Sequence, residues 1–302
     1  MLALIAPGQG SQSPGMLNSW IQDPASLSLL NKWSTDIDLD LVRLGTTADA
    51  DEIKDTANAQ PLIVATSLLA AHALAVKDVA VTSGHSVGEL AAAAICGAVT
   101  DADALHLVRA RGIEMAKAAA QAPAGMSAVL GGDRDEVLTA IYSLGLIAAN
   151  DNGGGQIVAA GDLTALATLG QNPPTGARVR ALAVAGAFHT SFMSSAVAPL
   201  SDLADSIDLH QPSIPFISNK DGEIVRSESE IVARIVNQIA NPVRWDLCMH
   251  TLKTIGVTGV IELPPAGTLV GLLKRAAPEI ESFALKSADD LVAAREFAGR
   301  HA

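Results

Sequence analysis

Along the chain, short apolar runs alternate with longer stretches of helical spacing. Apolar runs bounded by turn residues are typical of buried strands, and apolar residues recurring every three to four positions are typical of helices. Four runs are predicted to be central strands: Leu2–Ala6, Val79–Thr82, Pro215–Ser218 and Val257–Leu263. Five stretches are predicted to be helices: Leu62–Leu74, Ser86–Cys96, Asp101–Lys117, Glu228–Ile239 and Thr268–Arg275. This alternation indicates an α/β fold with a mainly parallel sheet.

The stretch 125–185 has a different pattern. It predicts a strand, a helix, a glycine-rich hairpin, a second helix and a final strand: Met126–Leu130, Asp133–Ser143, Ile147–Ala160, Leu163–Gly170 and Arg178–Val184. This order indicates a small α+β subdomain, residues 125–185, inserted into a large α/β subdomain formed by residues 1–124 and 186–302. A cleft between two such units is a usual place for a ligand.

Composition narrows the class of protein. The chain has 302 residues and 49% are hydrophobic, so it can bury a large core, but only 3% are aromatic. The formal net charge of −12 argues against nucleic-acid binding and against docking on an anionic membrane. The apolar run at 2–6 is too short for a secretion signal. Cys96 and Cys248 are too few for a disulfide framework or a thiolate metal site, so a reduced, cytoplasmic setting is expected.

The stretch Gly84-His85-Ser86-Val87-Gly88 lies between a predicted strand and a predicted helix. A serine on such an elbow projects from a strained turn, near the free N–H groups of a helix N-terminus. Glycines on both sides suit a turn that leaves no room for side chains. A simple glycine-rich turn is the other interpretation, and the strand-to-helix context favours the nucleophile.

A serine hydroxyl needs a base that takes its proton, and the chain has seven histidines. His85 is adjacent to Ser86, but neighbours on a tight elbow point apart, so His85 is predicted to pack or to form a hydrogen bond. His189 follows a predicted strand and precedes a helical run near Ser191. Because ligands of α/β proteins bind at the carboxyl ends of strands, His189 is the candidate base. A capping or core histidine is the alternative.

Arg111 lies on the apolar face of the predicted helix 101–117. A cation that faces inward is costly unless an anion meets it. An ion pair with a buried carboxylate, or a side chain that extends past the helix edge, would explain it. A clamp for a substrate carboxylate would explain it equally well, because a guanidinium binds carboxylates in a bidentate manner.

Gln9 lies between two glycines in the turn Gly8-Gln9-Gly10 that follows the first predicted strand. In elbow enzymes, the oxyanion is held by the N–H of the residue after the nucleophile and by an N–H from a second loop. Val87 and Gln9 are the candidates for these two positions.

Several motifs resemble, in order, those of malonyl-CoA:acyl carrier protein transacylases, a family that includes polyketide synthase acyltransferase domains. They are GQGSQ at 8–12, QPLI at 60–63, GHSVGE at 84–89, RG at 111–112 with Met115, GQIVAAG at 155–161, AFH at 187–189, SN at 218–219, QIANPVRW at 238–245 and LLKR at 272–275. Together they cover nearly the whole chain. The resemblance implies an α/β-hydrolase-like large subdomain and a ferredoxin-like small one.

The resemblance also implies a ping-pong transfer in fatty-acid biosynthesis. Ser86 would attack the thioester of malonyl-CoA with His189 as base, and the malonyl-serine ester would pass to the phosphopantetheine thiol of acyl carrier protein. Arg111 would bind the malonyl carboxylate. The N–H groups of Gln9 and Val87 would hold the oxyanion.

Other positions carry further implied roles. The backbone carbonyl of Gln238 would orient His189. Asn150 and Asn152 would line the small-subdomain side of the cleft, and Met115 matches a substrate-binding position. Phe188 would select unsubstituted malonyl. No metal and no cofactor is expected, malonyl-CoA being a substrate, and the chain is expected to act as a monomer.

Alternatives remain open at this point. A serine esterase or thioesterase could use the same Ser86–His189 pair, and an acyltransferase of a polyketide or other specialised pathway would share the motifs. A carrier-binding subunit without activity is a third interpretation. Because CoA and acyl carrier protein are acidic like this chain, a local basic patch is expected; the candidates are Arg178, Arg180, Lys274, Arg275 and Lys286.

Overall fold

The computed structural model describes residues 1–302 and contains two β-sheets. The first sheet has six strands, in the order β11 (Glu281–Ala284), β10 (Gly259–Glu262), β1 (Leu2–Ala6), β2 (Val81–Gly84), β7 (Phe216–Ile217) and β8 (Ile224–Val225). All neighbours are parallel except β7 and β8. The predicted α/β class with a mainly parallel sheet is therefore confirmed.

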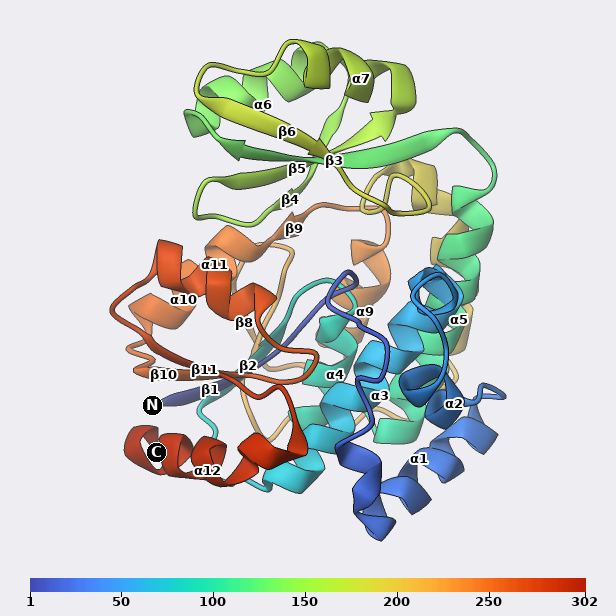
Figure 1. Cartoon of the computed structure of the whole chain (residues 1–302), viewed down its shortest axis with the longest axis vertical. Helices are drawn as coiled ribbons and strands as arrows, with labels where there is room; N and C mark the ends of the chain where they lie inside the picture. Colours follow the sequence, from blue (N-terminus) through green and yellow to red (C-terminus); the bar gives the residue numbers. More distant parts are fainter.

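Both faces of the first sheet are covered, which explains why β1 is apolar throughout. Leu2 and Leu4 point into the large core cluster, whereas Ala3 and Ile5 point into a second cluster on the opposite face, because successive strand residues alternate. Figure 1 shows helices α10 and α11 above this sheet and α12 below it. The helices outside the small unit are α1 (Pro24–Asp36), α2 (Leu41–Thr46), α3 (Thr56–Leu74), α4 (Gly88–Ile95), α5 (Asp101–Ala119), α8 (Val197–Ala204), α9 (Glu228–Gln238), α10 (Trp245–Thr254), α11 (Thr268–Ala276) and α12 (Leu291–His301).

The second sheet lies at the top of Figure 1, with α6 (Arg134–Ser143) and α7 (Leu163–Gln171) on its outer face. Its strand order is β6 (Ala177–Ala181), β3 (Ala124–Gly131), β5 (Gln156–Asp162), β4 (Ile147–Asp151) and β9 (Val243–Arg244). The first four strands are antiparallel, and β9 pairs with β4 in parallel. The second sheet is therefore not built from 125–185 alone, because β9 covers the edge that β4 would otherwise expose.

Several predicted elements differ from the structure in their bounds, and for two of them the contacts give the reason. Strand β2 is Val81–Gly84 rather than Val79–Thr82: its pairing with β1 begins at Val81 and continues through Ser83 and Gly84, which an apolar run does not include. Helix α3 begins at Thr56 and contains Pro61, which the prediction placed before the helix. Proline leaves the carbonyl four residues earlier without its helical partner. In this structure Nη1 of Arg109 donates to that carbonyl, of Ala57, over 3.0 Å.

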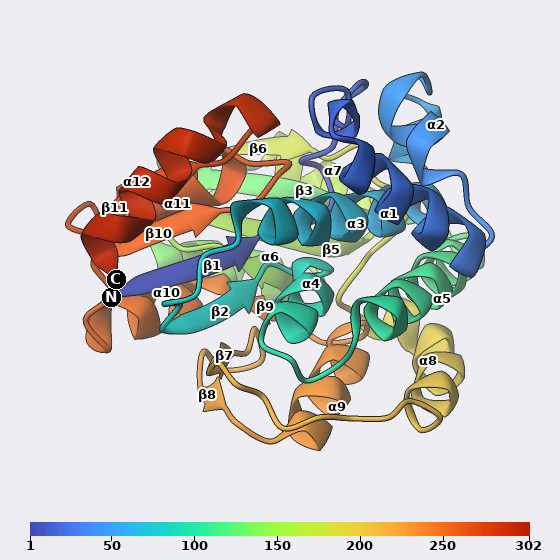
Figure 2. The ribbon, with the colours of Figure 1, turned by 90° about the horizontal axis from the view of Figure 1, so that it is seen from below.

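Seen from below, α3, α4 and α5 lie side by side across the first sheet (Figure 2). They bring the end of β2, the start of α4 and the middle of α5 together. No helix combines the length and the apolar character that crossing a bilayer requires.

Candidate active site

Ser86 lies on a tight turn between β2 and α4, with a backbone φ of +53°. A Cβ on Gly84 would overlap the carbonyl group of Gly88, and a Cβ on Gly88 would overlap the carbonyl oxygen of Ala6. Both glycines are therefore required by the close approach of the elbow to itself and to β1. A positive φ outside glycine stores about 1–3 kcal/mol of strain and is found mainly at functional sites.

His189 forms a hydrogen bond with the serine, with 2.7 Å between His189 Nε2 and Ser86 Oγ. His189 Nδ1 donates to the backbone carbonyl of Gln238 over 2.8 Å, so Nε2 is the free nitrogen that accepts the serine proton. Burial, with the nearby positive charge of Arg111, lowers the pKa of His189 to about 3. The imidazole is therefore neutral at physiological pH and available as a base.

The reason for expecting His189 at the site was wrong, although the residue is there. Strand β6 ends at Ala181 rather than Val184, and it belongs to the second sheet. His189 lies in the irregular segment that returns to the first unit and has a φ of +61°. Its N–H donates to the carbonyl of Ile239 over 3.1 Å, so the end of α9, not a strand end, positions it.

Arg111 is 1% exposed and reaches the nucleophile from α5. Its hydrogen bonds go to three neutral oxygens: Nη1 donates to Gln60 Oε1 over 2.7 Å, and Nη2 donates to Gln238 Oε1 over 3.3 Å and to Ser86 Oγ over 3.4 Å. Its Nε has no partner. Since no carboxylate binds the guanidinium, the ion-pair interpretation is wrong. Burial lowers its pKa only to about 10, so it stays charged at neutral pH.

Two backbone N–H groups beside Ser86 are free. Neither Val87 nor Gln9 donates its N–H to another group of the chain, although Val87 is 1% exposed. The Gln9 side chain is held by Thr56 and Gln60. Free donors next to a nucleophile are suited to bind a developing oxyanion.

Ser86, His189 and Gln9 line a cavity of about 230 Å³ between the two sheets, the Ser86 cleft. Met115 and Phe188 form apolar walls, and Asn150 and Asn152 face them from the small unit. The rest of the lining, apart from Ser86 and His189, comes from Gly8, Gln9, Gly10, Ser11, Gln60, His85, Met126, Ala128, Gln156, Val158, Leu182, Val184, Thr268, Leu269 and Leu272. Gln238 and Arg111 lie behind this surface.

His85 joins the two units across the cleft. Its Nε2 donates to Asn152 Oδ1 over 2.7 Å, because Asn152 Nδ2 already donates to Gln156 Oε1. The ring packs edge-on against Trp245, with 5.7 Å between centroids. His85 does not contact Ser86 Oγ, in agreement with its predicted role as a hydrogen-bonding residue.

Sequence reasoning gave no role to three polar residues that the structure places at the site. They are Gln60, Glu89 and Asn219, which lie within the motifs QPLI, GHSVGE and SN. The motifs include these residues but do not indicate what each one does. Gln60 holds Arg111, and Asn219 Oδ1 accepts the N–H of Ser86 over 2.8 Å. Glu89 contacts Asn219 and Gln238. Their partners are distant in sequence, so spacing could not reveal them.

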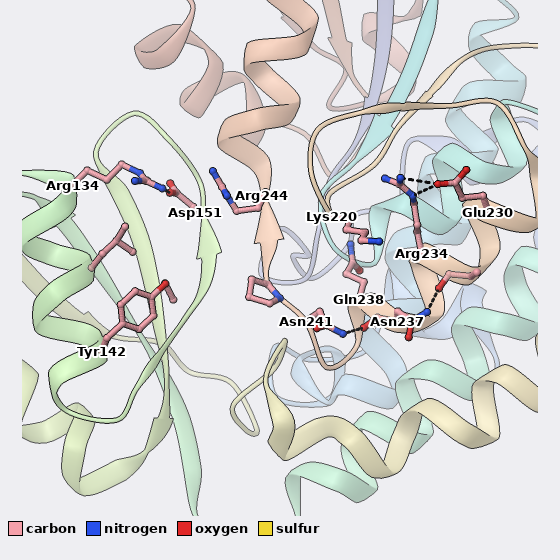
Figure 3. A pocket seen from close by; sticks show the side chains of 14 residues that line it. Arg134, Tyr142, Asp151, Lys220, Glu230, Arg234, Asn237, Gln238, Asn241 and Arg244 are labelled. Carbon is pink, nitrogen blue, oxygen red and sulfur yellow. Dashed lines mark hydrogen bonds and ion pairs between the residues drawn. The ribbon is translucent and has the colours of Figure 1, made fainter.

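A larger cavity, of about 740 Å³, lies on the other side of β4, and we call it the arginine hollow. In Figure 3, Arg134 and Tyr142 of the small unit face Arg244 and Gln238 of the large one. Its lining residues are Arg134, Leu138, Tyr142, Ala148, Asp151, Lys220, Glu230, Ala233, Arg234, Asn237, Gln238, Asn241, Pro242 and Arg244.

The three arginines of the arginine hollow are all neutralised. Arg134 pairs with Asp151 over 2.8 Å, Arg234 with Asp221 and Glu230, and Arg244 with Asp246. The lining holds no serine, cysteine or histidine that could act as a nucleophile or base. The chemistry of the molecule therefore lies in the smaller Ser86 cleft.

A serine–histidine pair on an elbow, beside free N–H donors, defines a site that passes acyl groups through a serine ester. The chain belongs to the acyl transferase domain family, which matches residues 4–293.

Named relatives agree with this membership. The chain is 52% identical to the malonyl CoA-acyl carrier protein transacylase of Mycobacterium tuberculosis (strain ATCC 25618 / H37Rv), over 96% of this chain and 98% of the relative. The crystal structure of MCAT from Mycobacterium tuberculosis superposes with a TM-score of 0.94, at 51% identity, over 97% of this chain and 99% of that one. A type II PKS acyl-carrier protein in complex with its malonyl-transacylase, PlMCAT:AntF, contains a similar chain, with a TM-score of 0.92, 28% identity and coverage of 98% and 99%.

Proposed function

We propose that the chain transfers the malonyl group of malonyl-CoA to the phosphopantetheine thiol of acyl carrier protein, in fatty-acid biosynthesis. The main support is the surroundings of Ser86 Oγ. This oxygen lies 2.7 Å from the neutral imidazole of His189 and 3.4 Å from the buried guanidinium of Arg111, which has no anionic partner. A short acyl group with a terminal carboxylate is the substrate that would satisfy both. The names of the relatives agree with this substrate.

In the first half-reaction, Ser86 Oγ attacks the thioester carbonyl while its proton moves to His189 Nε2. The negative carbonyl oxygen is held by the N–H groups of Val87 and Gln9; losing one such donor typically costs about 10²–10³ in rate. The C–S bond then breaks, and CoA leaves as a thiol with the proton from His189. In the second half-reaction, the carrier thiol gives its proton to His189 Nε2 and attacks the malonyl-serine ester, and Ser86 regains its proton.

Arg111 is proposed to bind the malonyl carboxylate, exchanging its weak contact with Ser86 for a charged one. A charged hydrogen-bonded pair contributes roughly 1.5–3 kcal/mol, which corresponds to about 10–100-fold preference over acetyl. Phe188 and Met115 limit the space beside the acyl chain, in support of unsubstituted malonyl. Asn150 and Asn152 offer amides to the rest of the substrate. The proposal requires no metal and no cofactor.

We infer an α/β-hydrolase-like unit, 1–124 and 186–302, and a ferredoxin-like unit, 125–185. The nucleophile elbow at the end of β2 supports the first. The β-α-β-β-α-β order of β3, α6, β4, β5, α7 and β6 supports the second.

The carrier protein is proposed to dock at the exposed cations Arg178, Arg180, Lys274, Arg275 and Lys286. None of the five forms an ion pair within the chain, so their charges are free for an acidic partner, and Leu272 of the adjoining α11 lines the Ser86 cleft. The monomeric state and the cytoplasmic setting stay predictions.

The similarity to PlMCAT favours one alternative, in which the carrier belongs to a polyketide pathway. Both versions share the malonyl-serine ester, so intact-protein mass spectrometry after exposure to mixed acyl-CoAs tests them together. We expect a base-labile malonyl adduct that disappears in Ser86→Ala and that a holo carrier protein removes. An adduct that persists in Ser86→Ala would refute the nucleophile, and rapid loss of the adduct to water would favour the esterase. Rates with a fatty-acid carrier and a polyketide carrier then separate the two pathways.

A further inference from the structure

Glu89 is a buried carboxylate that the reaction described above does not use. It is the second residue of α4, three positions after the nucleophile, and is 1% exposed. Burial raises its pKa to about 8, while the Asn219 N–H and the charge of Arg111 act in the opposite direction. A carboxylate in such a place is costly unless its oxygens are satisfied. Its contacts therefore indicate its role.

One contact leads to the nucleophile. Glu89 Oε1 accepts the backbone N–H of Asn219 over 2.6 Å. The side chain of Asn219 then holds the elbow on both sides of Ser86. Its Oδ1 accepts the N–H of Ser86 over 2.8 Å, and its Nδ2 donates to the carbonyl of Gly84 over 2.7 Å. Because these two backbone groups cannot exchange roles, the Asn219 amide has one orientation.

The other contact leads to the base and to the cation. Glu89 Oε2 accepts Gln238 Nε2 over 2.5 Å, and the same Nε2 donates to Asn219 Oδ1 over 3.0 Å. Gln238, seen from the arginine hollow in Figure 3, therefore turns its Oε1 toward Arg111 Nη2, 3.3 Å away. Its backbone carbonyl holds His189.

An amide can turn by half a revolution and exchange its oxygen and nitrogen. An ionised carboxylate only accepts hydrogen bonds, and the fixed Asn219 Oδ1 accepts as well, so the two oxygens together hold the nitrogen of Gln238 toward themselves and its oxygen toward Arg111. The reversed amide would place an NH₂ group against the guanidinium.

From this network we propose that Glu89 is a positioning residue of the transfer reaction: through the Gln238 amide it orients Arg111 toward the malonyl carboxylate. Once it is ionised, above a pH of about 8, the carboxylate also provides a counter-charge for Arg111, across one amide, while no substrate is bound. This inference rests on the proposed malonyl transfer. It concerns the preference between acyl groups, so its failure leaves the adduct on Ser86 intact and is distinguishable from failure of that function.

Glu89→Gln is the primary test, because it keeps the size of the side chain. The backbone N–H of Asn219 is fixed and will bind the oxygen of the introduced amide. The nitrogen of the introduced amide will then face the nitrogen of Gln238, and because two donors cannot bond to each other, the Gln238 amide will turn or move away from Arg111. We expect malonyl transfer, as kcat/KM at a pH of about 9, one unit above the Glu89 pKa, to fall roughly 10–100-fold, with acetyl transfer falling at most about threefold. Equal losses for the two acyl groups would overturn the proposal.

A double-mutant cycle tests whether Glu89 acts through Gln238. Gln238→Met keeps the backbone carbonyl for His189 but removes the amide, and it should reduce the malonyl preference by itself. Glu89→Gln combined with Gln238→Met should cost no more than the larger single loss, and losses that multiply would refute the route. If Glu89→Gln does not fold, Gln238→Met with an unchanged malonyl-to-acetyl ratio is sufficient to refute it.

The pH profile supplies a readout that a purely structural role would not change. In the wild-type protein, the malonyl-to-acetyl ratio should rise as the pH increases through about 8, because ionisation of Glu89 fixes the amide. The ratio should not change with pH in Glu89→Gln. If it still rises through a pH of about 8 in that variant, another group is responsible for the rise. The charged or titratable groups around Glu89 are Arg111 of α5, Arg234 of α9, Asp221 of the loop before β8 and Cys248 of α10. Glu296→Gln, on the exposed side of α12 and without an ion pair, is the matched control and should keep the wild-type profile.

Discussion

The Ser86 cleft and the arginine hollow are neighbours with opposite properties. Strand β4 and the residue after it form a wall between them, with Asn150 and Asn152 facing the cleft and Asp151 facing the hollow. The hollow is the larger, at about 740 Å³ against about 230 Å³. Its arginines are bound to carboxylates, whereas Arg111 behind the cleft binds only neutral oxygens.

This difference shows that unsatisfied polar groups, not volume, locate the chemistry. A buried donor without a full partner costs about 1–3 kcal/mol, so a folded protein keeps one mainly where a ligand will complete it. The cleft holds a partly satisfied guanidinium and two free N–H groups. The hollow completes the ion pairs of its three arginines, and its remaining cation, Lys220, is exposed to solvent.

The largest effect should come from removing the base of the cleft. His189→Ala should reduce malonyl transfer by about 10²–10⁴-fold, the usual contribution of a general base. Stopped-flow measurement of CoA release would follow the first half-reaction. A variant within threefold of the wild-type rate would show that another group takes the Ser86 proton.

The next effect concerns the unpaired cation. Arg111→Ala should lower kcat/KM for malonyl-CoA by about 10–100-fold and for acetyl-CoA much less. Arg109→Ala, on the same helix but bonded to the Ala57 carbonyl, is the control and should leave the ratio of the two unchanged. Equal losses in Arg111→Ala would mean that this arginine only supports the fold.

The buried imidazole of the Ser86 cleft should make the stability of the protein depend on pH. The unfolded protein binds a proton on His189 below a pH of about 6.5, whereas the folded protein does not until the pH approaches 3. Between these values the unfolded state holds more protons, so the free energy of unfolding falls as the pH falls. Chemical denaturation from pH 7 to pH 4 should show a shallower fall in His189→Gln. Parallel curves would contradict the neutral, buried imidazole.

The smallest effect is expected in the hollow. Arg134→Gln leaves the buried carboxylate of Asp151 with the Gly153 N–H as a remaining hydrogen-bond partner, so the free energy of unfolding should fall by about 1–3 kcal/mol although the arginine itself is half exposed. Transfer rates should stay within about twofold of the wild type. A tenfold change in rate would mean that the hollow communicates with the cleft through β4 or Gln238.

Features whose cause is local could be predicted from the sequence. The unbroken apolar run at 2–6 gave β1 with its observed bounds, and the two glycines around Ser86 indicated the elbow. Arg111 was recognisable because its neighbours on the helix are apolar. The pairing of Ser86 with His189 was predicted because a serine nucleophile needs a base and because the motifs resemble the family. In the structure the two side chains are in contact.

Features whose cause is a distant partner could not be predicted. Strand β9 forms only because β4 presents a free edge, and the start of β2 is set by pairing with β1. Glu89 meets Asn219 and Gln238 across 130 and 149 residues of sequence. No periodicity or motif spacing records such contacts.

Two of the four non-glycine residues with positive φ are Ser86 and His189. This affects how an inert protein for trapping a bound acyl-CoA should be made. Alanine at position 86 removes the hydroxyl but retains a Cβ in a left-handed backbone, whereas glycine removes both the reactivity and the steric conflict. Of the two inactive variants, Ser86→Gly is therefore expected to have the higher melting temperature. It should also be the better choice for cocrystallisation with an unreacted thioester.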